Sequence, residues 1–352
     1  MFEKVNPSHP DKVADRIAGA IVDLCYTKSR NRWSNESSAI LDLSTAEGRQ
    51  MWAQANPKVA CEVLIGHGEC NIQVETSEQI GAEDIGAIVS RIAGEGIETR
   101  ALIVPQDIHL AANQQHGVRC GDNGIFRGVP PTHEQKLLTA IAASIYDRHP
   151  FDGKYIIGQA YDRWPNFDGG PDIMEPILGG HELTICQSHA KKQEIKDLLC
   201  EFFRKNGAIV LPLFDDRAQI DDDLYFFSDK RINPLGEWTG GINVDCGAVN
   251  RKLGSDMGDG VSGGGLHGKD LSKGDVSINI VAYLKAVQSG QTVTACCSIG
   301  DEQVTFQYAS GKTETETFAD VVEMARLYIL TDCNGSFERF AEWGLVRPLA
   351  QV

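Results

Sequence analysis

The sequence predicts an α+β protein made of three similar, intertwined subdomains in a pseudo-threefold arrangement, each a β-sheet with helices covering one face. Two observations carry this prediction. Strands come in pairs between single helical segments, and such a grouping recurs about three times along the 352 residues without a clear sequence repeat. A chain of this length can form two or three packed units, each with its own core.

We expect an N-terminal subdomain over residues 1–105, a central one over 106–230 and a C-terminal one over 231–352 with a glycine-rich phosphate loop. Residues 25–57 are polar with weak periodicity and are interpreted as an insertion with some helix. Residues 107–128 carry Asn, Gln and several glycines, which predicts a long functional loop.

Helices are predicted where apolar residues recur every three or four positions, and strands where they alternate. The first helix covers residues 9–25, with Ser8 as its N-cap and Asp11 near its positive end. A later helix over 190–206 has Gly207 directly after its C-terminus. Further helices are expected over 134–148, 275–287 and 318–330, and strands over 58–76 (two, around the turn Gly66–Gly68), 99–106, 153–162, 181–189, 208–214, 292–300 and 302–310.

Composition excludes several classes of protein. The chain has 33 basic and 49 acidic residues, a formal net charge of −16, and no basic stripe that would suit a nucleic acid. No run approaches the roughly 18 apolar residues of a membrane span. The first residues show no signal-peptide pattern. We therefore expect a cytoplasmic protein without a nucleic-acid or membrane partner.

The ten cysteines are scattered and include no C-x-x-C pair, a usage typical of reduced thiols rather than of a disulfide framework or a zinc site. Apolar surroundings predict that four of these thiols are buried. They are Cys61, Cys186, Cys200 and Cys246.

The stretch GGGLHGKD, Gly263–Asp270, comes within one residue of a P-loop. Asp270 stands where a P-loop has the Ser or Thr that ligates Mg²⁺, while backbone N–H groups hold the phosphates. A carboxylate in that place would repel phosphate unless a metal intervened. The stretch therefore fits a degraded ATPase loop, a surface glycine turn or a phosphate site of another design.

Charge and glycine gather in four places: Ser8–Lys12, Gly121–Gly124, residues 233–252 and residues 263–275. The first suits phosphate and Mg²⁺ at a helix start, or a plain capped helix, and the second suits a solvated bend equally well. The last two combine cations with glycines, which are costly unless the backbone must approach a ligand closely. We interpret these two as a functional site. Their cations are Arg251, Lys252, Lys269 and Lys273.

In these stretches the sequence resembles the S-adenosylmethionine synthetases (methionine adenosyltransferases). The motifs are HPDKVADRI, ACE with a second Glu thirteen residues on, GDNG, INPLG, DCG followed by RK, and GGGLHGKDLSKGD, in family order. Between them the match is remote, so the chain resembles a divergent member. The resemblance implies that GGGLHGKD is a phosphate loop whose lysine meets a triphosphate, with metal held elsewhere and no hydroxyl required.

The family reaction joins ATP and L-methionine: the methionine sulfur attacks C5′ and expels triphosphate, which water then cleaves to phosphate and pyrophosphate. A thioether attacks without losing a proton, so no general base is needed. This agrees with a sequence that has no convincing Ser-His-Asp or Cys-His arrangement. The transition state needs alignment of sulfur, carbon and oxygen, and cations on the departing triphosphate.

The resemblance assigns the triphosphate to a group of cations. His9 would donate a hydrogen bond near the bridging oxygen, and Asp152, in FDGK, would contact the nucleotide. Trp238 would offer a stacking surface for adenine. The implied catalytic residues are His9, Lys154, Arg251, Lys252 and Lys269, and the ATP-binding residues are these five with Asp152, Trp238, Asp245 and Leu266.

The resemblance assigns most of the site carboxylates to methionine and to the metal ions. Glu75 resembles the residue that holds the methionine ammonium, and Lys273 the one that contacts its carboxylate. Fixed negative charge beside the future sulfonium favours the product. The implied methionine-binding residues are Glu75, Gln106, Asp122, Asp245 and Lys273, and the implied metal ligands are Asp11 and Asp275 for two Mg²⁺ and Glu62 for K⁺.

Family members share their active sites across a dimer, so the resemblance implies a homodimer or a dimer of dimers. Some assignments have plain alternatives: Glu62 could be a salt-bridged structural residue, and Glu75 could face solvent. His67 and His267 match no family role and are interpreted as bystanders, and His189 has no assignable chemistry.

The sequence also departs from the family. Glu237 and Trp238 stand where the family has Arg-Phe, and Val104 stands in place of a Gln, for which Gln106 could substitute. A negative charge beside a polyphosphate is costly, so we expect Glu237 to point away. The closing motif is reduced to FERFAEWG, and these changes predict retained chemistry with altered assembly or regulation.

Two other functions are open to this sequence. A catalytically silent homologue could bind nucleotide or methionine as a regulatory subunit, although every proposed cation and both metal aspartates are present. A kinase would need a P-loop hydroxyl and an acceptor base that the sequence does not supply.

Overall fold

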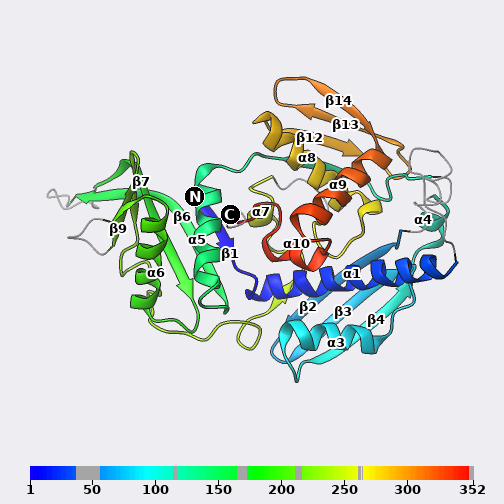
Figure 1. The fold of residues 1–352 in the computed structure, drawn as a ribbon, viewed down its shortest axis with the longest axis horizontal. Coiled ribbons are helices and arrows are strands. Elements are labelled where there is room, and N and C mark those ends of the chain that lie inside the picture. Colours follow the sequence, from blue (N-terminus) through cyan, green and yellow to red (C-terminus); the bar gives the residue numbers. More distant parts are fainter. Residues whose placement is uncertain are drawn as a thin grey trace. The chain divides into compact units, whose positions relative to one another are not determined.

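The computed structural model describes residues 1–36, 56–113, 117–164, 173–210, 216–260, 263 and 265–348 (Figure 1). The chain forms two compact units. Unit 1 combines residues 1–9, 132–241 and 347–352, and unit 2 combines residues 10–131 and 242–346. The units are described one at a time.

Unit 1 holds a six-stranded sheet in the order β1-β6-β7-β10-β9-β8. The N-terminal strand β1 (Phe2–Val5) lies antiparallel to β6 (Gly153–Trp164), so residues far apart in sequence, such as Phe2 and Ile157, share one sheet. Helices α5 (His133–Tyr146) and α6 (Lys192–Lys205) pack on this sheet and on each other. The other strands are β7 (Ile173–Gln187), β8 (Ile209–Val210), β9 (Arg217–Ile220) and β10 (Asp223–Phe226).

The first sheet of unit 2 has the order β11-β2-β3-β4. Strands β2 (Val59–Gly66) and β3 (Glu69–Thr76) form a hairpin, and β4 (Glu98–Pro105) pairs parallel to β3. Helices α1 (Pro10–Glu36) and α3 (Ala82–Ala93) cover one face (Figure 1). The short strand β11 (Gly247–Ala248) brings the glycine-rich segment to the edge beside β2.

The second sheet of unit 2 has the order β14-β13-β12-β5. Strands β12 (Val293–Cys297), β13 (Gln303–Tyr308) and β14 (Thr313–Thr317) follow one another, whereas β5 (Gly124–Gly128) comes from far upstream. Helices α8 (Asp275–Ser289) and α9 (Phe318–Asp332) cover this sheet. The remaining elements of unit 2 are α4 (Ile108–Asn113), α7 (Leu253–Asp256), the 3₁₀ turn Leu271–Lys273 and α10 (Phe337–Trp343).

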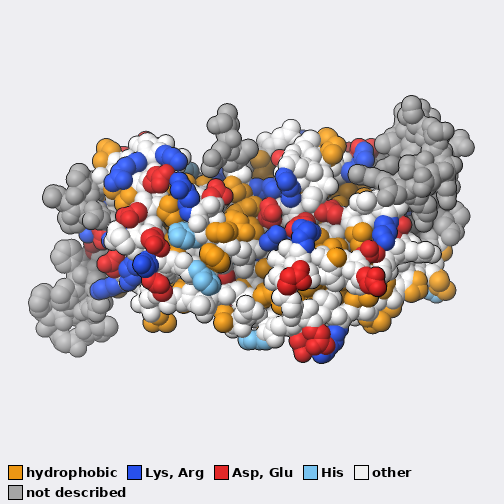
Figure 2. Space-filling view, turned by 60° about the horizontal axis from the view of Figure 1, so that its bottom comes forward, with side chains coloured by type: hydrophobic (Ala, Val, Ile, Leu, Met, Phe, Trp, Pro, Cys, Tyr) orange, Lys and Arg blue, Asp and Glu red, His pale blue; other side chains and the backbone are white. Residues whose placement is uncertain are grey.

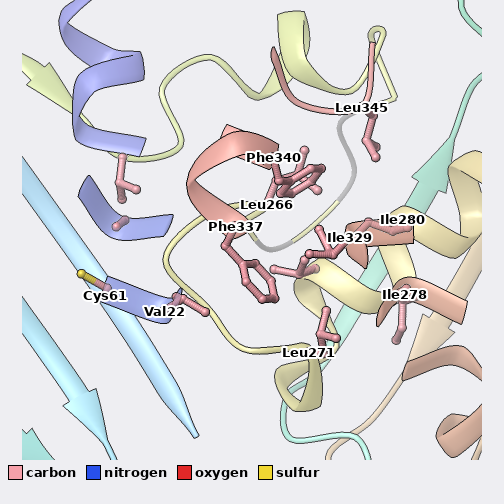
Figure 3. Close-up of a cluster of buried hydrophobic side chains, with 14 of the residues drawn as sticks. Val22, Cys61, Leu266, Leu271, Ile278, Ile280, Ile329, Phe337, Phe340 and Leu345 are labelled. Atoms are coloured by element: carbon pink, nitrogen blue, oxygen red, sulfur yellow. The ribbon is translucent and has the colours of Figure 1, made fainter. Parts of the chain in front are cut away.

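Apolar side chains from both sheets and their helices form one continuous core in unit 2. In Figure 3, Val22 of α1, Cys61 of β2 and Leu266 of the glycine-rich loop lie around Phe337 and Phe340 of α10. The loop is therefore anchored in the core at Leu266, whose side chain is fully buried.

The N-terminus of α10 is capped by a side chain of α1. Asp23 accepts hydrogen bonds from the N–H groups of Phe337 (2.8 Å) and Glu338 (3.1 Å) and from the hydroxyl of Ser336 (2.7 Å). A carboxylate at this position satisfies N–H groups that have no partner within the helix. Asp23 thus fixes the reduced C-terminal motif to the first helix.

The three sheets, each covered by helices, confirm the α+β class and fit the predicted three subdomains with a pseudo-threefold arrangement. The boundaries at residues 105 and 230 stay predictions. The helix predicted to end at residue 25 continues to Glu36, and residues 37–55 of the proposed insertion lie outside the described part. Strand β8 covers only the start of the segment predicted over 208–214, whose later residues also lie outside it.

Four other expectations were wrong or incomplete. Helix α1 begins at Pro10, and the hydroxyl of Ser8 donates to the carbonyl of Pro150 (3.0 Å), so Ser8 is not the N-cap. The segment 107–128 contains α4 and β5, because β5 gains its pairing from β12 rather than from local sequence. Cys246 is exposed and Cys186 is only half-buried, whereas Cys61 and Cys200 are buried.

Acidic and basic side chains are interspersed over the face shown in Figure 2. Within the described residues, no helix is both long and apolar enough to cross a membrane.

The hairpin β13–β14 carries a carboxylate with an unusually low pKa. The side chain of Glu314 accepts hydrogen bonds from Lys312 (2.6 Å), Tyr308 (2.6 Å) and Lys285 (2.9 Å), which lower its pKa to about 2. A depressed pKa stabilises the fold above the unfolded-state pKa, and this contribution is lost as the pH falls toward the folded value.

We therefore expect Glu314→Gln to lower the free energy of unfolding at pH 6 and to have a smaller effect near pH 3. Urea unfolding of both proteins at the two pH values measures the difference. An equal loss at both pH values would contradict a role for the ionised carboxylate.

Candidate functional site

Asp270, the residue that broke the P-loop pattern, is fully buried and points into the fold. Its carboxylate accepts hydrogen bonds from the N–H groups of Val59 (2.6 Å) and Ser272 (2.7 Å). Its own N–H donates to the carbonyl of Val59 (2.8 Å). Asp270 therefore attaches the glycine-rich loop to β2, and its charge is turned toward backbone donors.

Lys269, next in the loop, is paired with Asp275 at the start of α8. Its Nζ lies 2.8 Å from Asp275 Oδ2, and the carboxylate is only 2% exposed. Burial lowers the pKa of Lys269, but the hydrogen bond and the charge of Asp275, with Glu62 and Asp122 nearby, raise it overall. Lys269 is thus a stable cation, and the residues around it are the predicted Mg²⁺, K⁺ and methionine carboxylates.

A second charged group surrounds Asp11 at the start of α1. Its Oδ1 accepts from the N–H of Ala248 (3.0 Å) and lies 3.3 Å from Arg251, and its Oδ2 lies 3.5 Å from Lys252 Nζ. Strand β11 reaches this helix terminus because Gly247 has no side chain: a Cβ there would overlap the carbonyl of Pro10. The structure thus brings together three predicted site residues from two distant segments.

Three of the predicted methionine residues, Glu75, Gln106 and Lys273, lie near the ends of β3 and β4. Lys273 Nζ lies 3.7 Å from Glu75 Oε1, which also accepts from the N–H of Asp107 (3.3 Å). Glu75 pairs in register with Val104, and the N–H of Gln106 donates to the carbonyl of Thr76 (3.2 Å). An acid and a base at this spacing suit the two charged ends of an amino acid.

Three further predicted carboxylates lie elsewhere in unit 2. The turn that contains Asp122 is held by the N–H of Gly121, which donates to the carbonyl of Ser272 (2.9 Å). Burial raises the pKa of Glu62, against the attraction of Lys269. Asp245 is exposed and accepts from the N–H of Cys246 (2.7 Å) in its own turn.

Unit 1 carries the other predicted ATP residues. Asp152 Oδ2 accepts from the N–H of Gly241 (2.9 Å), and a Cβ on Gly240 would lie within 2.7 Å of both Asp152 Oδ2 and the Trp238 ring. Gly240 therefore lets the tryptophan lie close to the aspartate. Lys154 pairs with the half-buried Glu3 at 2.8 Å.

His9 is half-buried, and its N–H donates to the carbonyl of Asn6 (3.0 Å). His189, which had no assigned chemistry, supports Trp238: its N–H donates to the carbonyl of Trp238 (3.0 Å), and its ring lies 4.5 Å from that of Phe151. Glu237, at the position of the charge reversal, is exposed.

Leu266 has its side chain in the core, so its predicted contact with ATP would be made by its backbone. The roles assigned to all these residues stay predictions.

A buried group of charges was missed by the sequence analysis. Lys12, Asp15, Asp256 and His267, here called the buried ion cluster, are each at most 3% exposed. Lys12 Nζ lies 2.9 and 2.8 Å from the two carboxylate oxygens of Asp256. The available signals were the helical i, i+3 spacing of Lys12 and Asp15 and a histidine inside a glycine turn, neither of which identifies a partner from another segment.

The donor sets fit the metals that the resemblance implies. Asp11 and Asp275 offer hard carboxylate oxygens beside phosphate-type cations, and Mg²⁺ commonly takes one or two carboxylates together with substrate phosphates and waters. Glu62 offers one carboxylate of the kind that a hard monovalent cation accepts.

The fold and the site define an α+β protein whose glycine-rich segment carries paired cations and carboxylates. No protein-family model matches the chain. It is 26% identical to an S-adenosylmethionine synthase of Helicobacter acinonychis (strain Sheeba), with 99% of this chain and 89% of the relative covered. It is also 26% identical to an S-adenosylmethionine synthase of Helicobacter pylori (strain J99 / ATCC 700824), with 94% of this chain and 80% of the relative covered.

A solved structure described as an unusual S-adenosylmethionine synthetase from Campylobacter jejuni shares the fold. Its TM-score is 0.60 and its sequence identity is 18%, over 98% of this chain and 93% of that one. The resemblance seen in the motifs is therefore confirmed over nearly the full length. The chain is thus similar, at low identity, to S-adenosylmethionine synthases over nearly its full length.

Proposed function

We propose that this protein is a methionine adenosyltransferase that converts ATP, L-methionine and water to S-adenosylmethionine, phosphate and pyrophosphate. One observation carries the proposal: Lys269, Arg251 and Lys252 are each held by a predicted metal aspartate, Asp275 or Asp11, in a strongly acidic protein. Cations held in these two groups suit a polyphosphate, which would otherwise be repelled by the net charge.

In the proposed reaction the protein binds ATP and methionine and aligns their reacting atoms. Glu75 takes the methionine ammonium and Lys273 its carboxylate, which directs the sulfur toward C5′ of ATP. The sulfur uses its own lone pair, so no side chain has to remove a proton. The three cations stabilise negative charge on the triphosphate as the C5′–O bond breaks. Asp122 and Asp245 favour the sulfonium that forms.

We also propose the family's metals. Asp11 and Asp275 would hold two Mg²⁺ and Glu62 would hold K⁺. Bound Mg²⁺ would supply extra positive charge on the triphosphate oxygens. Lys269 pairs with Asp275, and Arg251 and Lys252 pair with Asp11, so each proposed Mg²⁺ ligand lies beside a cation that would contact the phosphates.

A homodimer or dimer of dimers with shared active sites belongs to the same proposal. The side chains of Leu64 on β2 and Leu102 on β4 are 52% and 57% exposed, and their neighbours along the strands are buried in β2 and half-buried in β4. They border a hollow of the sheet lined also by Glu62 and Gln73. Exposed leucines on a broad sheet face suit a second protein surface. Sedimentation should show at least a dimer, and an active monomer would contradict this.

The first test is an assay of the purified protein with ATP, L-methionine, Mg²⁺ and K⁺, which follows S-adenosylmethionine by mass and phosphate and pyrophosphate in the same sample. We expect product from the wild type. We expect His9→Asn to lower the rate by about 10²–10³, the usual cost of one preorganised donor.

Product from the wild type without a loss in His9→Asn would contradict the assigned role of His9. The absence of product, together with binding of an ATP analogue, would favour the silent regulatory homologue. Glu237 would then be the first position to revert to arginine.

A further inference from the structure

The buried ion cluster is held together by short contacts around His267. Its Nε2 lies 3.1 Å from Asp256 Oδ2 and 3.8 Å from Asp15 Oδ2. Lys12 Nζ lies 3.7 Å from Asp15 Oδ2 and binds both oxygens of Asp256. Because ionised carboxylates only accept hydrogen bonds, the Nε2–H of His267 is the donor to Asp256.

Three side chains of the buried ion cluster are also possible metal ligands. Asp15, Asp256 and His267 offer ligand atoms within 4.8 Å of one another. The ammonium of Lys12 already fills the space beside both carboxylates, and a metal ion would have to displace it. Lys12 is therefore the cation of the cluster. His267 joins the glycine-rich loop to Asp256 and Asp15.

Each member of the cluster lies close in sequence to a proposed ATP or Mg²⁺ residue. Lys12 follows Asp11, and His267 precedes Lys269 by two positions. Asn250 connects the two segments: its N–H donates to Asp15 Oδ1 (2.9 Å), its Oδ1 accepts from the N–H of His267 (3.4 Å), and Arg251 comes next in the chain.

The cluster also reaches the C-terminal segment. The carbonyl of Asp256 accepts from the N–H of Leu345 (2.8 Å), and the ring of His267 lies 5.3 Å from that of Phe340. A loop held from both sides in this way has little freedom to move its lysine.

We propose that His267 is a positioning residue: through Asp256 and Asp15 it fixes the phosphate loop to α1, so that Lys269 and Arg251 meet ATP in one geometry. This inference rests on the proposed function and deepens it. It gives a role to a histidine that the sequence marks as a bystander.

The test compares His267→Leu, which keeps an apolar side chain but removes the donor, with His267→Gln, whose amide can donate from about the same place. We expect His267→Leu to lower kcat/KM for ATP by about 10- to 100-fold, because small misplacements of aligned groups are costly. The KM for methionine should change little. His267→Gln should retain most of the activity.

Asp23→Asn is the matched control. It disturbs a partly buried carboxylate of α1 that also contacts α10, but no proposed ATP residue lies beside it. Thermal unfolding of all three variants shows the loss of stability. The proposal requires that His267→Leu impair ATP kinetics beyond an Asp23→Asn protein of equal or lower stability.

Calorimetry with Mg²⁺ and adenylyl imidodiphosphate separates this inference from the synthetase proposal. If the wild type forms no product but binds the analogue, and His267→Leu weakens that binding while His267→Gln restores it, the positioning role stands and the synthetase proposal fails. Equal kinetics and equal analogue affinity in wild type and His267→Leu would overturn the positioning role alone. A wild type that neither turns over nor binds the analogue would overturn both.

Discussion

Replacement of Lys269 by Met should lower the rate of S-adenosylmethionine formation by about 10²–10³, with the protein still folded. Lys269 Nζ is 2.8 Å from Asp275 and emerges from the glycine-rich loop, whose neighbouring residue Asp270 is bound to β2. Its charge therefore comes from a fixed position, and a preorganised cation needs no rearrangement as the triphosphate departs. Steady-state kinetics with ATP and methionine measure the effect.

The variant also leaves Asp275 buried without its cation, which itself costs stability. Burial already raises the pKa of Asp275, and the loss of Lys269 removes the main opposing influence. A double variant, Lys269→Met with Asp275→Asn, should recover stability but not activity. Lys205→Met, on an exposed part of α6, should leave the rate unchanged. A Lys269→Met protein with nearly wild-type kcat would remove this lysine from the proposed chemistry.

Replacement of Lys12 by Met should lower the free energy of unfolding by about 3–5 kcal/mol, the usual cost of leaving a buried charge without its partner. Lys12 is fully buried and contacts both oxygens of Asp256 and one of Asp15. Methionine fills a similar volume but leaves two carboxylates without a cation. Urea unfolding at neutral pH measures the difference.

Two comparisons separate the charge effect from packing. Lys12→Met with Asp256→Asn removes one charge of each sign and should be more stable than the single variant. Lys312→Met breaks the largely exposed pair with Glu314 and should cost far less stability than Lys12→Met, because solvent screens an exposed ion pair. A Lys12→Met protein that loses no more than the Lys312→Met protein would show that the cluster contributes little to stability.

Hydrophobic patterns within single elements predicted much of this architecture. Helical spacing in residues 275–287 and alternation in β2 and β3 each depend on neighbours within one element, so the sequence alone predicts them. The ends were less well predicted: α1 continues eleven residues past the expected residue 25. The strand β5 was missed because its five residues are specified by pairing with β12, about 170 positions away.

The candidate site, too, was predicted only in part. The glycine-rich segment and its cations were visible in sequence, because costly glycines beside lysines and arginines are unusual unless a ligand comes close. Which carboxylate holds which cation was not visible. The pairing of Asp11 with Arg251 joins residues 240 positions apart, and no local period encodes such a contact.

By itself the sequence determined the α+β class, most helices and strands, and the segments in which charge and glycine meet. Only the tertiary structure decided that Asp270 faces the backbone of β2 and that His267 lies with Lys12, Asp15 and Asp256 inside the fold. The physical reason is that a charged side chain is buried only where partners from other segments offset its loss of water. Those partners are fixed by how the sheets and helices pack.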